Sequence, residues 1–264
     1  MATNCVLMSP ERPNCDVSDD AILGGRLRIL QPQAGHRVGH DAVLLAAATP
    51  ARAGEHAVDL GAGVGAAGLA LATRVERLSV TLLEIDSDLV ALATQNAARN
   101  SLAERVRAVI ADVAAPDAMA GLASGSVDHV LMNPPFNDPS RQHVSPEPRR
   151  RRAHAGTPDM LDAWVKTAGR LLRVGGTLTL IFQAAGIAEV LQALGPGFGA
   201  IAVLPIYSKP GAPAIRILAQ AVKASRAPIK LCPGLLLNGV DGRPTLEAEA
   251  VLRQAGTLCL DTAA

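Results

Sequence analysis

Four consecutive residues, Asn133, Pro134, Pro135 and Phe136, combine groups that could hold a flat amino group for reaction. The Asn133 amide oxygen and the Pro134 carbonyl can each accept a hydrogen bond from one NH2 group, and Phe136 can stack on the plane behind it. Residues 127–132 form an apolar run that predicts a buried strand, which the two prolines end. The stretch should therefore lie at the carboxyl edge of a sheet, where open α/β sheets bind ligands. A strand that simply ends in a proline turn is the alternative interpretation.

A glycine-rich loop earlier in the sequence is suited to binding a nucleoside or a phosphate. Residues 56–60 predict a short strand, and Gly63, Gly65 and Gly68 after it satisfy the G-x-G-x-x-G spacing. Glu84 ends the next predicted strand about 20 positions later, where a carboxylate suits the hydroxyl pair of a ribose. The pattern fits either a nicotinamide dinucleotide or another nucleoside cofactor, and an ordinary charged strand end is the alternative for Glu84.

Further carboxylates stand at the ends of other predicted elements. Asp112 follows a predicted strand at residues 106–110 and could accept a hydrogen bond from the amino group of a bound adenine, with Ile85 and Val113 as apolar walls. An aspartate exposed to solvent after a strand is equally common. Asp41 precedes an Ala/Leu run that predicts a helix, so this side chain could cap the helix or face a ligand.

A long polar stretch at residues 137–156 follows the Asn-Pro-Pro-Phe turn and has no apolar periodicity. It contains four consecutive arginines, Arg149, Arg150, Arg151 and Arg152. Next to a pocket the size of a base, such a cluster could bind phosphates. A charge run that is simply solvated is the alternative interpretation.

The composition excludes several classes of protein. Of the 264 residues 49% are hydrophobic but only 2% are aromatic, so Ala, Leu and Val must fill the core. The net charge of +1 excludes a globally basic nucleic-acid binder and leaves only local patches. The four cysteines are scattered without a C-x-x-C pair, so neither a metal site nor a disulfide framework is expected. With neither a signal peptide nor a membrane span in view, we expect a cytoplasmic protein.

Strand and helix patterns alternate along the chain and end in two consecutive strands joined by a Lys-Pro-Gly turn. This order predicts an α/β protein with a Rossmann-like, seven-stranded, mainly parallel sheet and a late antiparallel hairpin. We divide the chain into a disordered lead-in (1–18), an N-terminal strand and helix that cover the ligand site (19–50), the main domain (51–225) and a C-terminal extension (226–264).

The element order, the stretch from Asp59 to Gly65 and the Asn-Pro-Pro-Phe tetrapeptide resemble class I S-adenosylmethionine-dependent methyltransferases. The tetrapeptide narrows the resemblance to enzymes that modify planar amino nitrogens. Residues 35–46, Gly-His-Arg-Val-Gly-His-Asp-Ala-Val-Leu-Leu-Ala, and residues 216–218 make the chain similar to the tRNA1(Val) adenine-37 N6-methyltransferase family. Phe136 stands where that family commonly has Tyr, which keeps the stacking ring and loses a hydroxyl.

The resemblance implies S-adenosyl-L-methionine as the cofactor, RNA (a tRNA) as the partner, and a role for each residue of the motifs. Asn133 would lie between cofactor and acceptor, and Phe136 would stack on the flipped base. The implied cofactor residues are Gly39 and Asp41 from the N-terminal side, Asp59, Gly61 and Gly63 at the methionine part, Glu84 and Ile85 at the ribose, Asp112 and Val113 at the adenine, and Asn133.

Several other functions stay open at this stage. A protein-glutamine N5-methyltransferase would use the same tetrapeptide on a side-chain amide, and a guanine N2-methyltransferase of rRNA would use it on another base. A nicotinamide dehydrogenase leaves the tetrapeptide without a role. A non-catalytic RNA-binding module would need more stacking aromatic residues than this chain has. The sequence does not indicate an oligomeric state.

Overall fold

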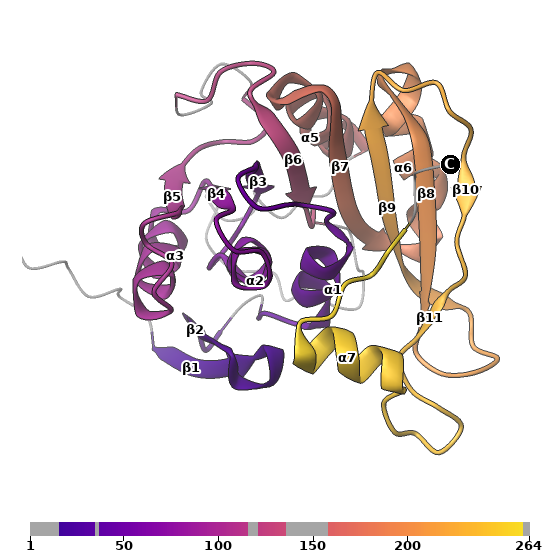
Figure 1. Cartoon of the computed structure of the whole chain (residues 1–264), viewed down its shortest axis with the longest axis horizontal. Coiled ribbons are helices and arrows are strands. Elements are labelled where there is room, and N and C mark those ends of the chain that lie inside the picture. The colour runs from indigo at the N-terminus through magenta and orange to yellow at the C-terminus, as the bar shows by residue number, and fades with distance from the viewer. Residues whose placement is uncertain (1–15, 35–36, 116–120, 136–157, 261–264) are drawn as a thin grey trace, which may run out of the picture.

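The computed structural model of the chain describes residues 16–34, 37–115, 121–135 and 158–260. The strands of its main sheet are β3 (His56–Leu60), β4 (Ser79–Glu84), β5 (Val106–Ile110), β6 (Val127–Met132), β7 (Leu172–Gln183), β8 (Phe198–Tyr207), β9 (Ala214–Lys223), β10 (Lys230–Leu231) and β11 (Leu235–Leu236). Their order is β10-β8-β9-β7-β6-β3-β4-β5, with β11 also paired to β8 (Figure 1). Only β9 runs antiparallel to its neighbours β7 and β8, so the predicted mainly parallel sheet with a late antiparallel hairpin is confirmed.

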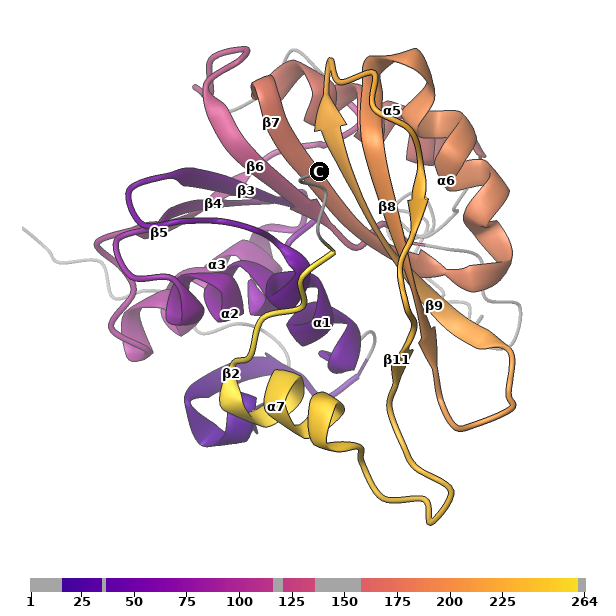
Figure 2. The same cartoon turned by 45° about the vertical axis from the view of Figure 1, so that its right-hand side comes forward.

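Helices cover both faces of this sheet (Figure 2). They are α1 (His40–Ala48), α2 (Ala66–Arg74), α3 (Ser87–Arg99), α5 (Pro158–Leu171), α6 (Ile187–Leu194) and α7 (Leu246–Gln254). One buried cluster joins α1, α2 and α3 to one face, and a second joins α5 and α6 to the other. The central strands are mostly apolar because both of their faces are buried, and Asp59, Thr81 and His129 are buried polar exceptions.

The central parallel strands end level with one another. Leu60 at the end of β3 pairs with Leu83 of β4 and with Met132 of β6. Glu84 pairs with Ile110, the last residue of β5. The loops that follow these strands therefore share one edge of the sheet, as the class I methyltransferase fold predicts.

The N-terminal segment forms a separate two-stranded antiparallel sheet of β1 (Val17–Ile22) and β2 (Leu27–Pro32), joined by the short helix η1 (Leu23–Gly25). β1 begins inside the stretch that the sequence analysis placed in a lead-in up to Ser18. Its polar sequence, Val-Ser-Asp-Asp-Ala-Ile, lacks clear alternation because β1 pairs only with β2 and buries neither face fully. Residues 1–15 lie outside the described part of the chain.

The C-terminal extension adds two strands that the sequence analysis did not predict, which is why the sheet has nine strands and not seven. Both β10 and β11 are two residues long and pair in parallel with β8. The chain then forms α7, which packs against α1 and η1. Within the described residues, no helix is long and apolar enough to cross a membrane.

Candidate cofactor and acceptor site

Four segments with predicted site residues meet at the carboxyl edge of the parallel strands. The glycine loop follows β3, Glu84 ends β4, Asp112 follows β5, and Asn133 follows β6. Because these strands are adjacent and end level, residues that are far apart in the sequence form one continuous edge. The structure thus brings together the residues that sequence reasoning assigned to cofactor and acceptor.

Asp59 is a buried carboxylate beneath the glycine loop, and it is 2% exposed. Its Oδ2 accepts a hydrogen bond of 2.9 Å from the Gly68 N–H, one of the free donors at the N-terminus of α2. Burial raises the pKa of the Asp59 carboxyl to about 7; the Gly68 N–H acts in the opposite direction, and the charge of Glu84 adds to the rise. With this pKa, the Asp59 carboxyl is only partly ionised near neutral pH, and a cationic ligand bound beside it would favour the ionised form.

Glu84 is fixed by three backbone N–H groups. Its Oε2 accepts a hydrogen bond of 2.9 Å from Gly63, and its Oε1 accepts bonds of 2.8 Å from Ile85 and 3.0 Å from Asp86. A carboxylate offers about four acceptor positions, so the backbone leaves roughly one for a ribose hydroxyl. A second hydroxyl bond would replace one from the backbone, and the bond from Gly63 connects Glu84 to the glycine loop.

The glycines of the loop have different surroundings. Gly61, Gly63 and Gly65 all have positive φ (66°, 56° and 88°), which favours glycine at each position. A Cβ on Gly61 would lie 2.2 Å from the Trp164 ring of α5, so this glycine also makes room for the indole. A Cβ on Gly63 would meet no atom within 4 Å, and this glycine therefore leaves the backbone open to a ligand.

The predicted adenine site consists of the acceptor Asp112 and two apolar walls, Val113 and Ile85, which differ in burial. Asp112 is exposed, and its Oδ1 accepts a bond of 2.9 Å from the Ala114 N–H. Val113 is buried, and its carbonyl accepts a bond of 2.9 Å from the hydroxyl of Thr167 on α5. Ile85 is 51% exposed, which is high for an isoleucine and fits a side chain that a flat ring could cover.

Asp41 reaches this edge through an ion pair. Its Oδ2 lies 3.0 Å from Nε of Arg216, which pairs with Gln183 at the end of β7. Both side chains are largely buried, and Asp41 belongs to the first turn of α1, where its negative charge is favourable. Gly39, the N-cap of α1, is exposed beside it.

Asn133 and Pro134 present their polar groups directly after β6. Oδ1 of Asn133 is buried and has no hydrogen-bond partner within the described part of the chain, although the residue as a whole is partly exposed. Such atoms are rare because an unsatisfied buried acceptor is costly, and they call for an explanation. Pro134 is buried and Pro135 partly exposed. Phe136 and the four arginines Arg149, Arg150, Arg151 and Arg152 lie outside the described residues.

Sequence reasoning missed three residues that support this edge: Trp164, Thr167 and Arg216. Each acts through a contact that no local pattern encodes, since Trp164 packs on Gly61 and Thr167 bonds to Val113 from a distant helix. Two signals were available: Trp164 is the only tryptophan of the chain, and Arg216 belongs to the stretch 216–218 that contributes to the family resemblance.

A model of the methyltransferase small domain family matches residues 34–206, more than half of the chain. The chain belongs to this family. Among curated members, a tRNA1(Val) (adenine(37)-N6)-methyltransferase of Bacteroides fragilis is 30% identical over 69% of this chain and 75% of its own length. A release factor glutamine methyltransferase of Chlorobaculum tepidum is 31% identical over 58% of this chain. The chain spans about half the length of that relative, 53%.

Solved structures of methyltransferases share the fold of this family member. A protein of Agrobacterium tumefaciens, described as a predicted O-methyltransferase, superposes with a TM-score of 0.70 at 28% identity. The match covers 83% of this chain and 98% of that one.

The cofactor of the chain is S-adenosylmethionine, and the described residues fit it. The open backbone at Gly63 allows close approach, and the Asp59 carboxyl suits a positively charged group. The Oδ1 atom of Asn133 is an acceptor without a donor at the same edge.

Proposed function

We propose that this chain transfers a methyl group from S-adenosylmethionine to an exocyclic amino group, namely N6 of an adenine in tRNA. The observation that carries the proposal is the buried Oδ1 of Asn133, which has no hydrogen-bond partner among the residues that the structure describes. An amino group is the donor that this atom lacks. The Pro134 carbonyl follows in the chain and supplies the second acceptor that a planar NH2 group can use.

The two acceptors solve a chemical difficulty of this reaction. The lone pair of an exocyclic amine is delocalised into its ring and is a poor nucleophile. Hydrogen bonds from both N–H groups to Asn133 and Pro134 favour a pyramidal nitrogen whose lone pair is free to attack. S-adenosylmethionine, when bound, would supply a methyl group on a positively charged sulfur, and Asn133 and Pro134 would hold the acceptor nitrogen toward that group.

Positioning then accounts for most of the rate. The acceptors hold the nitrogen in line with the methyl group, and such orientation can supply several orders of magnitude in rate. The extra proton on nitrogen leaves to solvent after transfer, so no strong general base is needed at this edge. A base in a folded RNA must be splayed out and stacked, which is the role we assign to Phe136.

The names of the relatives and a basic cluster support RNA as the substrate. The Bacteroides fragilis relative is named for a tRNA adenine, and Arg149, Arg150, Arg151 and Arg152 follow the acceptor turn. We assign to these arginines the phosphates that flank the flipped nucleotide. Replacing all four with Ala should weaken RNA binding most at low salt and leave S-adenosylhomocysteine binding unchanged. Superimposable salt curves for the two proteins would contradict this assignment.

A glutamine side chain in a release factor is the second candidate acceptor. The name of the Chlorobaculum tepidum relative supports this candidate, and the amide NH2 group of a glutamine would fit the same two acceptors. The geometry of Asn133 and Pro134 serves both substrates. The identity of the acceptor therefore has to come from the reaction product.

Transfer of tritiated methyl groups to separate tRNA, rRNA and protein fractions tests the proposal. We expect label in tRNA, recovered as N6-methyladenosine after digestion to nucleosides. Label recovered as N2-methylguanosine from rRNA, or as N5-methylglutamine from protein, would replace the proposed acceptor with one of the alternatives. The Asn133→Ala variant is the control for transfer at this site.

A further inference from the structure

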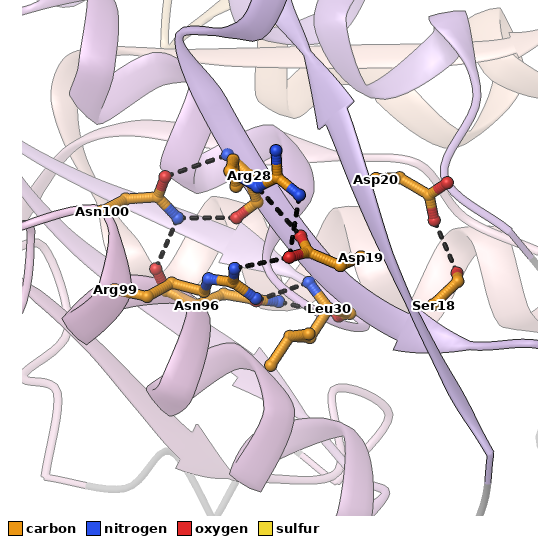
Figure 3. Close-up of polar contacts among 8 residues, drawn as sticks. All are labelled: Ser18, Asp19, Asp20, Arg28, Leu30, Asn96, Arg99 and Asn100. Carbon is orange, nitrogen blue, oxygen red and sulfur yellow. Dashed lines mark hydrogen bonds and ion pairs between the residues drawn. The ribbon is translucent and has the colours of Figure 1, made fainter.

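Asn96 connects the N-terminal hairpin, which consists of β1, η1 and β2, to the glycine loop. It lies on α3 and is 0% exposed. Its Oδ1 accepts a hydrogen bond of 2.7 Å from the Leu30 N–H of β2, and its Nδ2 donates one of 2.9 Å to the Leu30 carbonyl (Figure 3). Nδ2 donates its other hydrogen to the carbonyl oxygen of Val64, and this N···O distance is 3.0 Å. Val64 belongs to the glycine loop, one residue after Gly63.

Asn100, one helical turn further along, makes the same contact with β2 but not with the loop. Its Oδ1 accepts from the Arg28 N–H at 2.9 Å, and its Nδ2 donates to the Arg28 carbonyl at 2.7 Å (Figure 3). Both amides therefore pair with β2 as a neighbouring strand would, at residues two apart that face the same way. The remaining Nδ2 hydrogen of Asn100 bonds within α3, to the carbonyl of Asn96.

The chemistry of the amide makes the contacts of Asn96 hard to replace. An asparagine side chain has two donors and one acceptor oxygen, and Asn96 uses both donors and its oxygen. An aspartate would keep the bond from Leu30 and lose both donated bonds. Because the residue is fully buried, water cannot take the place of a lost partner.

Ion pairs on the outer surface contribute little to this connection. Asp19 of β1 lies 2.9 Å from Arg28 and 2.8 Å from Arg99 of α3. These side chains are between 29% and 54% exposed, and exposed ion pairs stabilise weakly. The two arginines hold the pKa of Asp19 below its usual value, so the pairs persist at neutral pH. The buried amide is therefore the stronger connection between hairpin and helix.

We propose that Asn96 is a positioning residue for cofactor binding. It holds the Val64 carbonyl, and thereby the conformation of the glycine loop, against the same strand that leads to Gly39 and Asp41. The N-terminal hairpin then belongs to the cofactor site although it is not part of the main sheet. This inference rests on S-adenosylmethionine as the cofactor and holds for any methyl acceptor.

Two matched variants test the proposal, Asn96→Ala and Asn100→Ala. Both remove a paired contact with β2, but only the first releases the loop. Asn96→Ala should weaken S-adenosylhomocysteine binding roughly tenfold, measured by calorimetry, because a buried hydrogen bond to the loop is lost. Asn100→Ala should change the affinity less than about twofold, because its partners do not reach the loop. Equal effects of the two variants, or none from Asn96→Ala, would overturn the proposal.

The unsubstituted protein provides a second test that does not depend on a variant that folds. S-adenosylhomocysteine should slow hydrogen exchange at the Leu30 amide, bonded to Asn96, more than at the Arg28 amide, bonded to Asn100. Residue-resolved exchange by NMR with and without the ligand measures both in one strand. Equal slowing at the two amides would show general stabilisation only and would overturn the coupling.

Discussion

At the amino edge of the central strands, polar side chains bond to one another. Nε2 of His129 lies 2.7 Å from Glu55, and Asp128 bonds to the Arg173 side chain at 2.6 Å and to the His56 N–H at 2.9 Å. Burial lowers the pKa of His129, although the neighbouring Glu55 acts in the opposite direction. The lowered pKa favours the neutral ring. Nδ1 of His129 has no partner among the described residues, but the residue is only 6% exposed, so the protein encloses this atom.

The carboxyl edge of the same strands leaves its groups for a ligand. Within the described residues, Oδ1 of Asn133 lacks a partner although Asn133 is partly exposed, and burial of the Asp59 carboxyl group is energetically costly. Each edge thus has one buried polar atom without a partner among the described residues, but His129 is enclosed by the protein whereas Asn133 is partly exposed. We expect substitutions at the amino edge to affect stability and those at the carboxyl edge to affect binding and catalysis.

The largest expected effect is that of Asn133→Ala. Loss of one amine acceptor should lower the single-turnover rate of methyl transfer on the order of 10²–10³-fold, as for other groups that stabilise a transition state. Binding of S-adenosylhomocysteine should change much less, and calorimetry checks this. A variant that keeps most of its turnover would remove the functional distinction between the two edges.

Glu84→Ala should have the next largest effect, on cofactor affinity. The substitution removes the ribose acceptor and also the bond that holds the Gly63 N–H. We expect S-adenosylhomocysteine to bind at least about tenfold more weakly, since a charged hydrogen-bond partner is lost. Tight binding of NADH to the unsubstituted protein would instead contradict the cofactor assignment.

The pH dependence of Asp59 should be smaller but has a defined sign. Burial raises the pKa of this carboxyl from 3.8 to about 7, so the folded chain keeps a proton that the unfolded chain loses. The free energy of unfolding should therefore fall as pH rises from about 4 to about 7 and level off above. Affinity for cationic S-adenosylmethionine should rise over about pH 6 to 8, at most about tenfold per unit. Asp59→Asn should flatten both curves, and an unchanged pH profile would contradict the raised pKa.

Asp128→Ala at the amino edge should leave catalysis unchanged. It removes the bonds to Arg173 and to the His56 N–H from a side chain that is 22% exposed. We expect the free energy of unfolding to drop by about 1–3 kcal/mol, measured by urea denaturation. A fall in the methyl-transfer rate comparable to that of Asn133→Ala would show that the edges are not functionally distinct.

Local patterns predicted much of the fold and the position of the candidate site. Apolar runs ending at Leu60 and Met132 predicted parallel strands, and loops after such strands must share an edge. The two short strands of the C-terminal extension escaped prediction because two residues carry no periodicity. The pairing of Asp41 with Arg216 spans 175 positions, and no local signal encodes such a contact.

Asn96 shows how a local pattern can point to a contact without identifying it. It lies on the apolar stripe of α3 with Leu92 and Ala93, where a buried amide must find partners. Its place on that stripe explains its burial, but the identity of its partners, Leu30 and Val64, depends on how the hairpin of β1 and β2 docks. Such long-range docking is the part of this structure that a single sequence does not reveal.

The contact between the hairpin and α7 has a consequence for biosynthesis. Gly24 lies so close to the Arg253 carbonyl that a Cβ would meet it at 2.5 Å, and the Arg26 side chain donates to the Gln254 carbonyl. These residues are more than 200 positions apart, and contacts of such separation form late because the chain must close a long loop. β1 and β2 are synthesised before α7, so their docking is complete only after α7 has formed, and until then their edges are exposed to mispairing.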